Sequence, residues 1–346
     1  MNTVELVPIT TPLNDQVLRL AVTAHLARYK GQTRAHTASD LSSFLNWCAV
    51  NNLPPLTAQR AHIELYLRWL QEVRQPVGSR VTEHRHTATM TERAQSFGSV
   101  APAYERFRPG YPDELVDEVL DYAGRPVRTA LELGAGTGKA TRVFARRGIV
   151  VTATDPDPAM LAELRNHVPN TVTTVQAAFE DLPLTSVYDL VFAAASLHWT
   201  KPDSRWARVV AMLKRDGIFA SFGGQVHLAD SDVERDVCVA RSPFLANDEV
   251  PPPDGTPADS PMQWPGTELT RSDRFTDVRQ STIERRYTAS ARDYVGHLST
   301  VSAYLELPHP VRERVLGRIL TVLPERVTLV ADITLHLARP RSARIG

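Results

Sequence analysis

The chain has 346 residues, which is longer than one average domain, so we expect two domains. Its 39 basic and 39 acidic residues balance, which excludes an overall field that attracts nucleic acid or an anionic membrane. The N-terminus lacks a secretory signal pattern, and no stretch is as long as the run of about 18 apolar residues that a membrane span needs. With only two cysteines, Cys48 and Cys238, expected as free thiols, these features predict a cytoplasmic protein.

The first 80 residues predict a small all-helical bundle. Apolar residues recur at helical spacing in residues 15–30, 33–51 and 57–74. Pro54 and Pro55 separate the second segment from the third, because proline does not fit inside a helix. The periodicity then ends in a polar stretch, and we expect a linker over residues 81–92.

From residue 93 onwards the sequence alternates between short apolar strands and amphipathic helices. The expected strands cover residues 129–133, 149–155, 171–178, 188–196, 217–223, 275–287 and 326–339, the last two around a helical insert. Apolar strands separated by helices are typical of a doubly wound parallel sheet. Residues 93–346 are therefore predicted to form an α/β domain.

The first predicted strand runs into a glycine-rich loop, LELGAGTGKAT, at residues 131–141. A phosphate-binding P-loop would need a glycine at Leu133 and a hydroxyl side chain at Ala140. A dinucleotide loop of the form G-x-G-x-x-G would need a glycine at Lys139. The sequence fits neither motif in its standard form.

A loop for a nucleoside is the remaining interpretation. Three alternate glycines, Gly134, Gly136 and Gly138, allow the backbone to approach a flat ligand without Cβ clashes. Asp155 ends the next predicted strand, where a carboxylate can accept both ribose hydroxyls and exclude a 2′-phosphate. Lys139 opens the following helix, and we expect it to face solvent. The loop thus predicts an adenosine-bearing cofactor that has no phosphates.

Several motifs in order give the chain a resemblance to a known family. They are SFGSVAPAYERFRPGYP, LELGAGTGKAT, TATDPDPAML, AAFEDLPL and YDLVFAAASLHWTKPDSRW. From about Ser96 to Arg341 the chain resembles class I S-adenosylmethionine-dependent methyltransferases of type 11, specifically the small-molecule group related to trans-aconitate methyltransferase. The resemblance implies a Rossmann-like sheet with a helical cap. It also implies S-adenosylmethionine as cofactor and a carboxylate, hydroxyl or amine of a small molecule as methyl acceptor.

The same resemblance implies which residues bind the cofactor. They are Glu132, Gly134, Ala135, Gly136, Gly138, Asp155, Pro156, Met160, Phe179, Glu180 and Ala195. Glu132 and the glycines would line the methionine half, Asp155 would bind the ribose, and Met160 would pack on the adenine. Many family members carry an aspartate where this chain has Ala178, so Phe179 and Glu180 are the expected substitutes. Ala195 and Ser196 would lie behind the sulfonium.

The candidate catalytic residues are His198, Tyr104 and Arg108. A hydroxyl or amine acceptor needs a base, and His198 is the candidate by its usual pKa. A carboxylate acceptor needs only a positive clamp, for which Arg106 and Arg108 are suited. Each of these residues also has a structural interpretation, as a strand cap, a surface arginine or aromatic packing. We expect no metal site, because the histidines and cysteines lack ligand spacing.

Residues 15–76 resemble the N-terminal core-binding domain of tyrosine recombinases, the phage integrases. The motifs are YKGQTRAHTASDLSSFLNWCAVNNL and HIELYLRWLQEVRQ. The resemblance implies a helical DNA clamp, but its fourth helix and the recombinase catalytic domain do not follow. We expect a truncated domain with weak, salt-sensitive DNA contact at most. The alternative function is therefore a DNA-binding module with a non-catalytic cofactor domain. The sequence leaves the acceptor's identity and the oligomeric state open.

Overall fold

The protein is described here by a computed structural model. It describes residues 16–28, 37, 41, 44–45, 47–48, 53–60, 62–67, 95–184, 188–245, 248, 252–257 and 259–341. The chain divides into two compact units. The larger unit takes in Arg85–Asp230, Glu249–Leu305 and Pro324–Gly346, and the smaller one joins the N-terminal part of the chain to Ser231–Asp248 and Glu306–Leu323.

A seven-stranded sheet forms the centre of the larger unit, with the strand order β3-β2-β1-β4-β5-β10-β7. Its parallel strands are β1 Thr129–Leu133, β2 Val150–Asp155, β3 Thr173–Gln176, β4 Tyr188–Ala194 and β5 Leu213–Gly223. The chain order reverses between β1 and β4, and α/β proteins bind ligands beyond the carboxyl ends of strands at such a point. The predicted Rossmann-like α/β fold is confirmed.

The two C-terminal strand predictions were wrong in one respect, because each segment contains two strands. The first is β7 Phe275–Ile283 followed by β8 Arg286–Ser290, and the second is β9 Arg326–Val330 followed by β10 Ile333–Pro340. β10 pairs antiparallel with β5 and with β7, so the main sheet is mixed. β8 and β9 instead join β6 His227–Leu228 in a separate antiparallel sheet.

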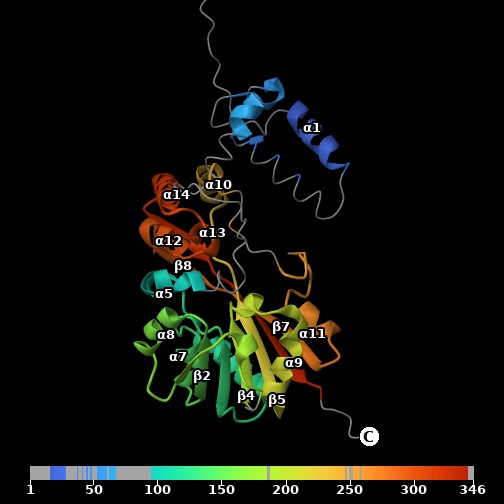
Figure 1. Ribbon diagram of the computed structural model, residues 1–346, viewed down its shortest axis with the longest axis vertical. Helices are drawn as coiled ribbons and strands as arrows, with labels where there is room; N and C mark the ends of the chain where they lie inside the picture. The colour runs from blue at the N-terminus through green and yellow to red at the C-terminus, as the bar shows by residue number, and fades with distance from the viewer. Residues whose placement is uncertain are drawn as a thin grey trace, which may run out of the picture. The chain divides into compact units, whose positions relative to one another are not determined.

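The larger unit also contains helices, some of which cover the two faces of the main sheet. They are η3 Gln95–Val100, α5 Ala101–Phe107, α6 Asp113–Ala123, α7 Thr141–Ala145, α8 Pro158–Arg165, η4 Phe179–Asp181, η5 Leu197–Trp199, α9 Pro202–Met212, α11 Gly266–Arg271, α12 Ala291–Leu298 and α13 Ser302–Leu305. Ala130 and Phe192 pack in one apolar cluster with α6 and α7. Leu131 and Val191 pack in the other with α9 and α11, which lie beside β5 and β7 in Figure 1. Adjacent strand residues thus serve opposite faces.

The smaller unit is helical in its described residues. It contains α1 Gln16–Leu26, η2 Pro55–Thr57, α10 Ser231–Arg241 and α14 His309–Val322. Phe44, Trp47 and Tyr66 form an aromatic cluster, with Tyr66 centred 5.1 Å from Phe44 and 5.6 Å from Trp47. The predicted linker at 81–92 lies outside the described residues, and the complete N-terminal bundle stays a prediction. Among the residues described, no helix has the length and apolar character to cross a membrane.

Candidate functional site

The glycine loop follows β1 at the carboxyl edge of the sheet. Gly134, Gly136 and Gly138 have φ values of 69°, 55° and 83°, a left-handed region that costs other residues free energy. The loop is closed by two backbone hydrogen bonds, from Ala135 N to Thr154 O at 2.8 Å and from Gly138 N to Ala135 O at 2.9 Å. The alternate glycines are therefore required by the backbone path itself.

The three glycines differ in what surrounds them. A Cβ on Gly134 would lie 2.6 Å from Cβ of Ser196, and one on Gly138 would lie 2.7 Å from Cγ of Leu164. A Cβ on Gly136 would meet no described atom within 4 Å. Gly134 and Gly138 are thus needed for internal packing, whereas Gly136 presents bare backbone to open space, where a ligand can approach.

Asp155 lies at the end of β2, directly against this loop. Its Oδ2 accepts a hydrogen bond from Gly136 N and its Oδ1 accepts one from Asp157 N, both at 2.9 Å. Burial raises the pKa of Asp155 to about 6, although these two hydrogen bonds oppose the shift. Each carboxylate oxygen keeps a further lone pair, so the group can still accept hydrogen bonds from hydroxyls.

Glu132 lies in β1 beneath the loop and is completely buried. Its Oε2 accepts a hydrogen bond from Thr141 Oγ1 at 2.5 Å, whereas Oε1 has no hydrogen-bond partner within the described residues. Burial raises the pKa of Glu132 to about 8. Leaving a buried carboxyl oxygen unpaired is costly. The unpaired oxygen and the open side of Gly136 fit a cofactor that carries both a nucleoside and an amino group.

Helix α5 is fastened onto the glycine loop through Glu105. The Glu105 carboxylate accepts a hydrogen bond from Thr137 Oγ1 at 2.7 Å, and both its oxygens lie 2.8 Å from Nη2 of Arg142. Nζ of Lys139 donates to the Glu105 carbonyl at 2.6 Å, and only 12% of the Lys139 side chain is exposed. The prediction that Lys139 faces solvent was wrong, because its sequence neighbours do not reveal the packing of α5.

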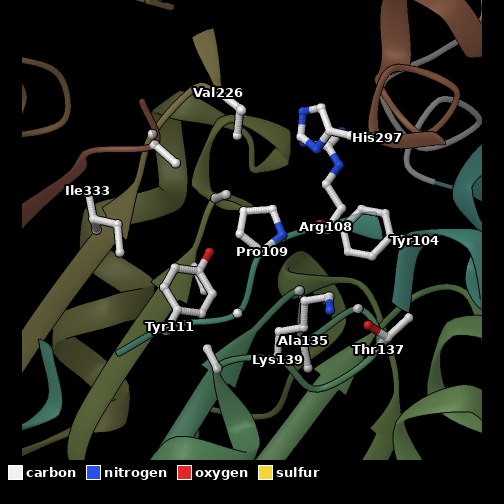
Figure 2. Close-up of a pocket in the computed structure, with 18 of the residues that line it drawn as sticks. Tyr104, Arg108, Pro109, Tyr111, Ala135, Thr137, Lys139, Val226, His297 and Ile333 are labelled. Atoms are coloured by element: carbon white, nitrogen blue, oxygen red, sulfur yellow. The ribbon is translucent and has the colours of Figure 1, made fainter. Parts of the chain in front are cut away.

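A cavity of about 80 Å³ opens above the loop. Seven predicted site residues line it: Tyr104, Arg108, Glu132, Gly134, Ala135, Gly136 and Ala195. Figure 2 shows Ala135 and Lys139 on one side of this cavity and His297 and Val226 on the other. The structure therefore brings together the glycine loop, the end of α5 and residues from the C-terminal third of the chain.

Other predicted residues are not among the described residues that line the cavity. They are Gly138, Asp155, Pro156, Met160, Phe179, Glu180 and His198. Met160 is buried on α8, and Phe179 is buried in η4 beneath the Arg208 guanidinium, which lies 5.4 Å from the ring centre. Glu180 Oε1 accepts a hydrogen bond from Lys201 N at 2.7 Å. Pro156 lies between β2 and α8.

His198, the predicted base, belongs to η5 rather than to the cavity wall. Its ring centre lies 4.7 Å from that of Trp199. Burial, with Arg205 nearby, lowers the pKa of His198 to about 4. Trp199 in turn packs edge-on against Phe97, which packs edge-on against Tyr104, both at 6.1 Å between ring centres. His198 is thus part of an aromatic stack next to the cavity.

Arg108 is held at the cavity by Thr300, which lies between α12 and α13. Its Nε and Nη2 donate to Oγ1 and O of Thr300, both at 2.9 Å, and its guanidinium lies 5.2 Å from the Tyr104 ring centre. Arg106, the second arginine of the predicted clamp, lies over the Phe107 ring at 4.9 Å and is not among the described lining residues. Of the two arginines, Arg108 is the one that a ligand in the cavity would meet.

His297 was missed by the sequence reasoning. It lines the cavity from α12, is 4% exposed, and its Nδ1 has no partner among the described residues. Burial and the nearby Arg108 cation lower the pKa of His297 to about 3. One signal in the sequence was available: Tyr294 and Leu298 mark the apolar face of the helix, and a histidine on that face must be paired or functional.

Residues 131–221 match the family described as "Methyltransferase domain". Residues 131–221 are thus similar to a methyltransferase domain. This match covers β1 to β5, including the glycine loop and Asp155.

Individual proteins that are similar to the chain are also described as methyltransferases. An uncharacterized methyltransferase of Mycobacterium tuberculosis is 42% identical over 132 residues, which are 38% of this chain and 53% of that protein. A protein of Saccharomyces cerevisiae described as an S-adenosylmethionine-dependent methyltransferase is 30% identical, over 34% of this chain and 43% of its own. Trans-aconitate 2-methyltransferase of Delftia acidovorans is 35% identical, over 34% of this chain and 44% of that protein. The chain spans about half the length of the curated relatives that it matches.

A solved structure extends the similarity beyond the parallel core. It is described as that of a type II methyltransferase from Anaeromyxobacter dehalogenans, with a TM-score of 0.50 and 26% identity. The match covers 67% of this chain and 98% of that one. These similarities show that the part of the chain around the glycine loop resembles methyltransferases.

Proposed function

We propose that the chain transfers a methyl group from S-adenosylmethionine to a small-molecule acceptor. The observation that carries the proposal is the arrangement around Gly136. Its bare backbone faces open space, Asp155 holds its N–H, and the unpaired oxygen of Glu132 lies in the neighbouring strand. An adenosine-bearing cofactor with an amino group matches these features.

The residues of the chain then act by binding and alignment. S-adenosylmethionine supplies an electrophilic methyl group when it is bound. In our proposal Asp155 accepts the ribose hydroxyls, Glu132 accepts from the amino group, and Arg108 pairs with the carboxylate of the methionine half. Ala135 of the loop and Ala195 line the same cavity. Methyl transfer is an in-line displacement, so positioning supplies most of the help that it needs.

The remaining predicted cofactor residues are kept in this proposal as the adenine end of the site. They are Gly138, Pro156, Met160, Phe179 and Glu180. Tyr104 closes over the cavity beside Arg108, and His198 stays a candidate acting through the aromatic stack. The acceptor is a carboxylate, hydroxyl or amine, and the similarity to trans-aconitate 2-methyltransferase supports a small-molecule acceptor.

Binding of S-adenosylmethionine to the full chain, measured by isothermal titration calorimetry, tests the proposal with a matched pair of variants. Gly136 and Gly148 both have positive φ, and an added Cβ at either meets no described atom within 4 Å. We expect Gly136→Ala to weaken binding at least tenfold and Gly148→Ala to leave it unchanged. Equal affinities in the two variants, or no binding by the wild type, would reject the proposed function.

The organisation of the chain is proposed as a helical domain at 1–80, a linker at 81–92 and the methyltransferase domain at 93–346. Helices α10 and α14 belong to the compact unit that includes the N-terminal residues. The recombinase-like character of residues 1–80, their DNA contact and a cytoplasmic location rest on the sequence alone. A gel shift with the full chain and with a variant lacking residues 1–80 tests the DNA contact.

A further inference from the structure

The cavity is lined by more positive charges than its own residues neutralise. Three cations line it, Arg108, Lys139 and Arg285, and among the described lining residues Glu132 is the one acidic residue. Nζ of Lys139 lies 3.6 Å from a Glu105 carboxylate oxygen, so this cation is paired. Arg108 and Arg285 have no ion-pair partner in the described part of the chain. A cation that is partly withdrawn from water is costly without a counter-charge, so these two arginines indicate a ligand that supplies one.

Hydrogen bonds fix Arg285, which lies between β7 and β8, at the wall of this cavity. Its backbone N donates to Oδ1 of Asp332 at 2.8 Å, and its backbone O accepts from Ala331 N at 2.9 Å. Its Nη1 donates to Gly110 O at 2.7 Å. Asp332 thus binds the Arg285 backbone, and no ion pair joins it to the guanidinium within the described residues. A guanidinium has five N–H donors, so Arg285 is held in place and keeps donors for a ligand.

The proposed cofactor contacts leave Arg285 without an opposite charge. In the proposed function Arg108 pairs with the carboxylate of the methionine half, and Glu132 accepts from its amino group. The third charge of S-adenosylmethionine is its sulfonium, which is positive like Arg285. An acceptor in the same cavity therefore meets two positive charges that no described residue neutralises, and a negative group on the acceptor is attracted by both.

A second polar group of the cavity also lacks a partner. His297 is 4% exposed, and its Nδ1 has no hydrogen-bond partner among the described residues. Figure 2 shows its ring on the side of the cavity opposite Ala135 and Lys139 of the glycine loop. A buried nitrogen without a partner is costly unless a ligand supplies the hydrogen bond, so His297 indicates a polar ligand and Arg285 indicates its charge. The other walls of the cavity are aromatic and aliphatic, from Tyr104, Tyr111, Val226 and Ile333.

We propose that the methyl acceptor is a small molecule that carries an oxyanion, a carboxylate or a phosphate, and that Arg285 binds this oxyanion. This inference rests on the proposed function. A planar guanidinium presents paired N–H donors that match two oxygens of either group. The aromatic and aliphatic walls enclose the rest of the molecule. A neutral acceptor of the same shape leaves Arg285 without a counter-charge and therefore binds more weakly.

Binding of three probes of similar shape to the full chain tests the charge of the ligand. Benzoate and phenyl phosphate carry the two kinds of oxyanion, and benzamide is the neutral counterpart of benzoate. Their affinities are measured by NMR titration with saturating S-adenosylhomocysteine, which lacks the sulfonium charge, so that there is no turnover and the attraction of Arg285 is measured alone. We expect at least one of the two anions to bind at least tenfold more tightly than benzamide, and the tighter anion identifies the kind of oxyanion.

Arg285→Gln and Arg286→Gln form a matched pair, because Arg286 is the next residue, is exposed and is not in the lining set. We expect Arg285→Gln to weaken binding of the anion roughly 10- to 100-fold, the loss expected for a hydrogen bond between charged groups, and to leave benzamide unchanged. Arg286→Gln should alter neither affinity. Arg285→Lys keeps the charge without the paired donors and should give an intermediate affinity. All three variants should bind S-adenosylmethionine as wild type does, which also shows that the site is folded.

Three results would overturn the inference. The first is that neither anion binds more tightly than benzamide, and the second is equal anion affinity in Arg285→Gln and Arg286→Gln. The third is weaker S-adenosylmethionine binding in Arg285→Gln, which would place Arg285 at the cofactor. If the wild type binds no S-adenosylmethionine, the proposed function fails, and an oxyanion that still binds through Arg285 is not a methyl acceptor.

Discussion

Glu105→Gln should loosen α5 from the glycine loop and lower both stability and cofactor affinity. The wild-type carboxylate lies 2.8 Å from Arg142 Nη2 through both oxygens, 2.7 Å from Thr137 Oγ1 and 3.6 Å from Lys139 Nζ. The glutamine removes the negative charge, so Arg142 and Lys139 lose their ion-pair partner. Because α5 carries Tyr104 and leads into Arg108, the wall of the cavity should move with it.

The expected magnitude follows from burial. The side chains of Glu105, Arg142 and Lys139 are 15%, 24% and 12% exposed. Removing one partner of a fully buried pair costs about 3–5 kcal/mol, whereas exposed pairs contribute about 0–1 kcal/mol. For this partly buried cluster we expect a loss of about 2 kcal/mol in the free energy of unfolding at pH 7.

The pH dependence provides a second test of the same variant. Burial alone would raise the pKa of Glu105, but Arg142, Thr137 and Lys139 together hold it below its usual value of 4.5. A lowered folded-state pKa stabilises the protein above the unfolded-state value, and the stabilisation is lost as pH falls through the folded-state pKa. The difference between wild type and Glu105→Gln should therefore shrink below about pH 4.5.

Urea unfolding of the full chain at pH 7 and pH 4 measures both effects. Glu114→Gln, at an exposed residue of α6, is the control and should match wild type within about 0.5 kcal/mol. If Glu105→Gln is as stable as Glu114→Gln at pH 7, or if its deficit is the same at pH 4, the ion-pair cluster does not anchor α5.

Three further variants, with Gly136→Ala as a comparison, test other parts of the larger unit. The wild type should lose stability as pH rises from about 5 to 8, and Glu132→Gln should remove this pH dependence. Burial raises the folded-state pKa of Glu132 to about 8, so ionisation of its carboxyl above about pH 4.5 opposes folding. Gly138→Ala should destabilise by about 2–4 kcal/mol, from left-handed strain and a clash with buried Leu164, whereas Gly136→Ala should lose only about 1–2 kcal/mol from strain. Asp189→Asn should destabilise by about 2–4 kcal/mol at pH 7, since Asp189 is 3% exposed and paired with Arg125 and Lys214.

Chemical denaturation across pH 4–8 measures all three. An unchanged pH slope in Glu132→Gln would show that its carboxyl is ionised without cost. Equal stabilities of the Gly138 and Gly136 variants would refute the packing argument for Gly138. For Asp189→Asn the deficit should stay constant from pH 8 down to about pH 5, because Arg125, Lys214 and two backbone N–H groups outweigh burial and hold the pKa of Asp189 well below its usual range; a deficit that fades within that range would have another cause.

Much of the glycine-loop part of the candidate site was predictable from local sequence. Alternate glycines after an apolar strand require left-handed backbone, and Asp155 ends the adjacent strand, so parallel pairing brings it to the loop. These features depend on residues within about 25 positions of one another, and strand periodicity is enough to relate them.

The part of the cavity that is formed by the C-terminal third of the chain was not predictable in the same way. His297 reaches the cavity from α12, and nothing near it in the sequence shows that α12 packs against α5. His198 follows β4, which ends at the same carboxyl edge of the sheet as the glycine loop. In η5, however, its ring packs against Trp199. The division of the two C-terminal segments into two strands each was not predictable for a related reason. The chain passes from one sheet to the other at Arg285 and at Ala331, and the local sequence does not mark either point.

The affinity of the full chain for S-adenosylmethionine, measured by calorimetry in wild type and in Asp155→Asn, tests the central claim most directly. The substitution preserves shape and removes the charge that would accept the ribose hydroxyls. We predict binding by wild type and a roughly 10- to 100-fold weaker affinity in Asp155→Asn, with the fold intact by circular dichroism. No binding by wild type, or the same affinity in both proteins, would contradict the assignment of this loop to an adenosine-bearing cofactor.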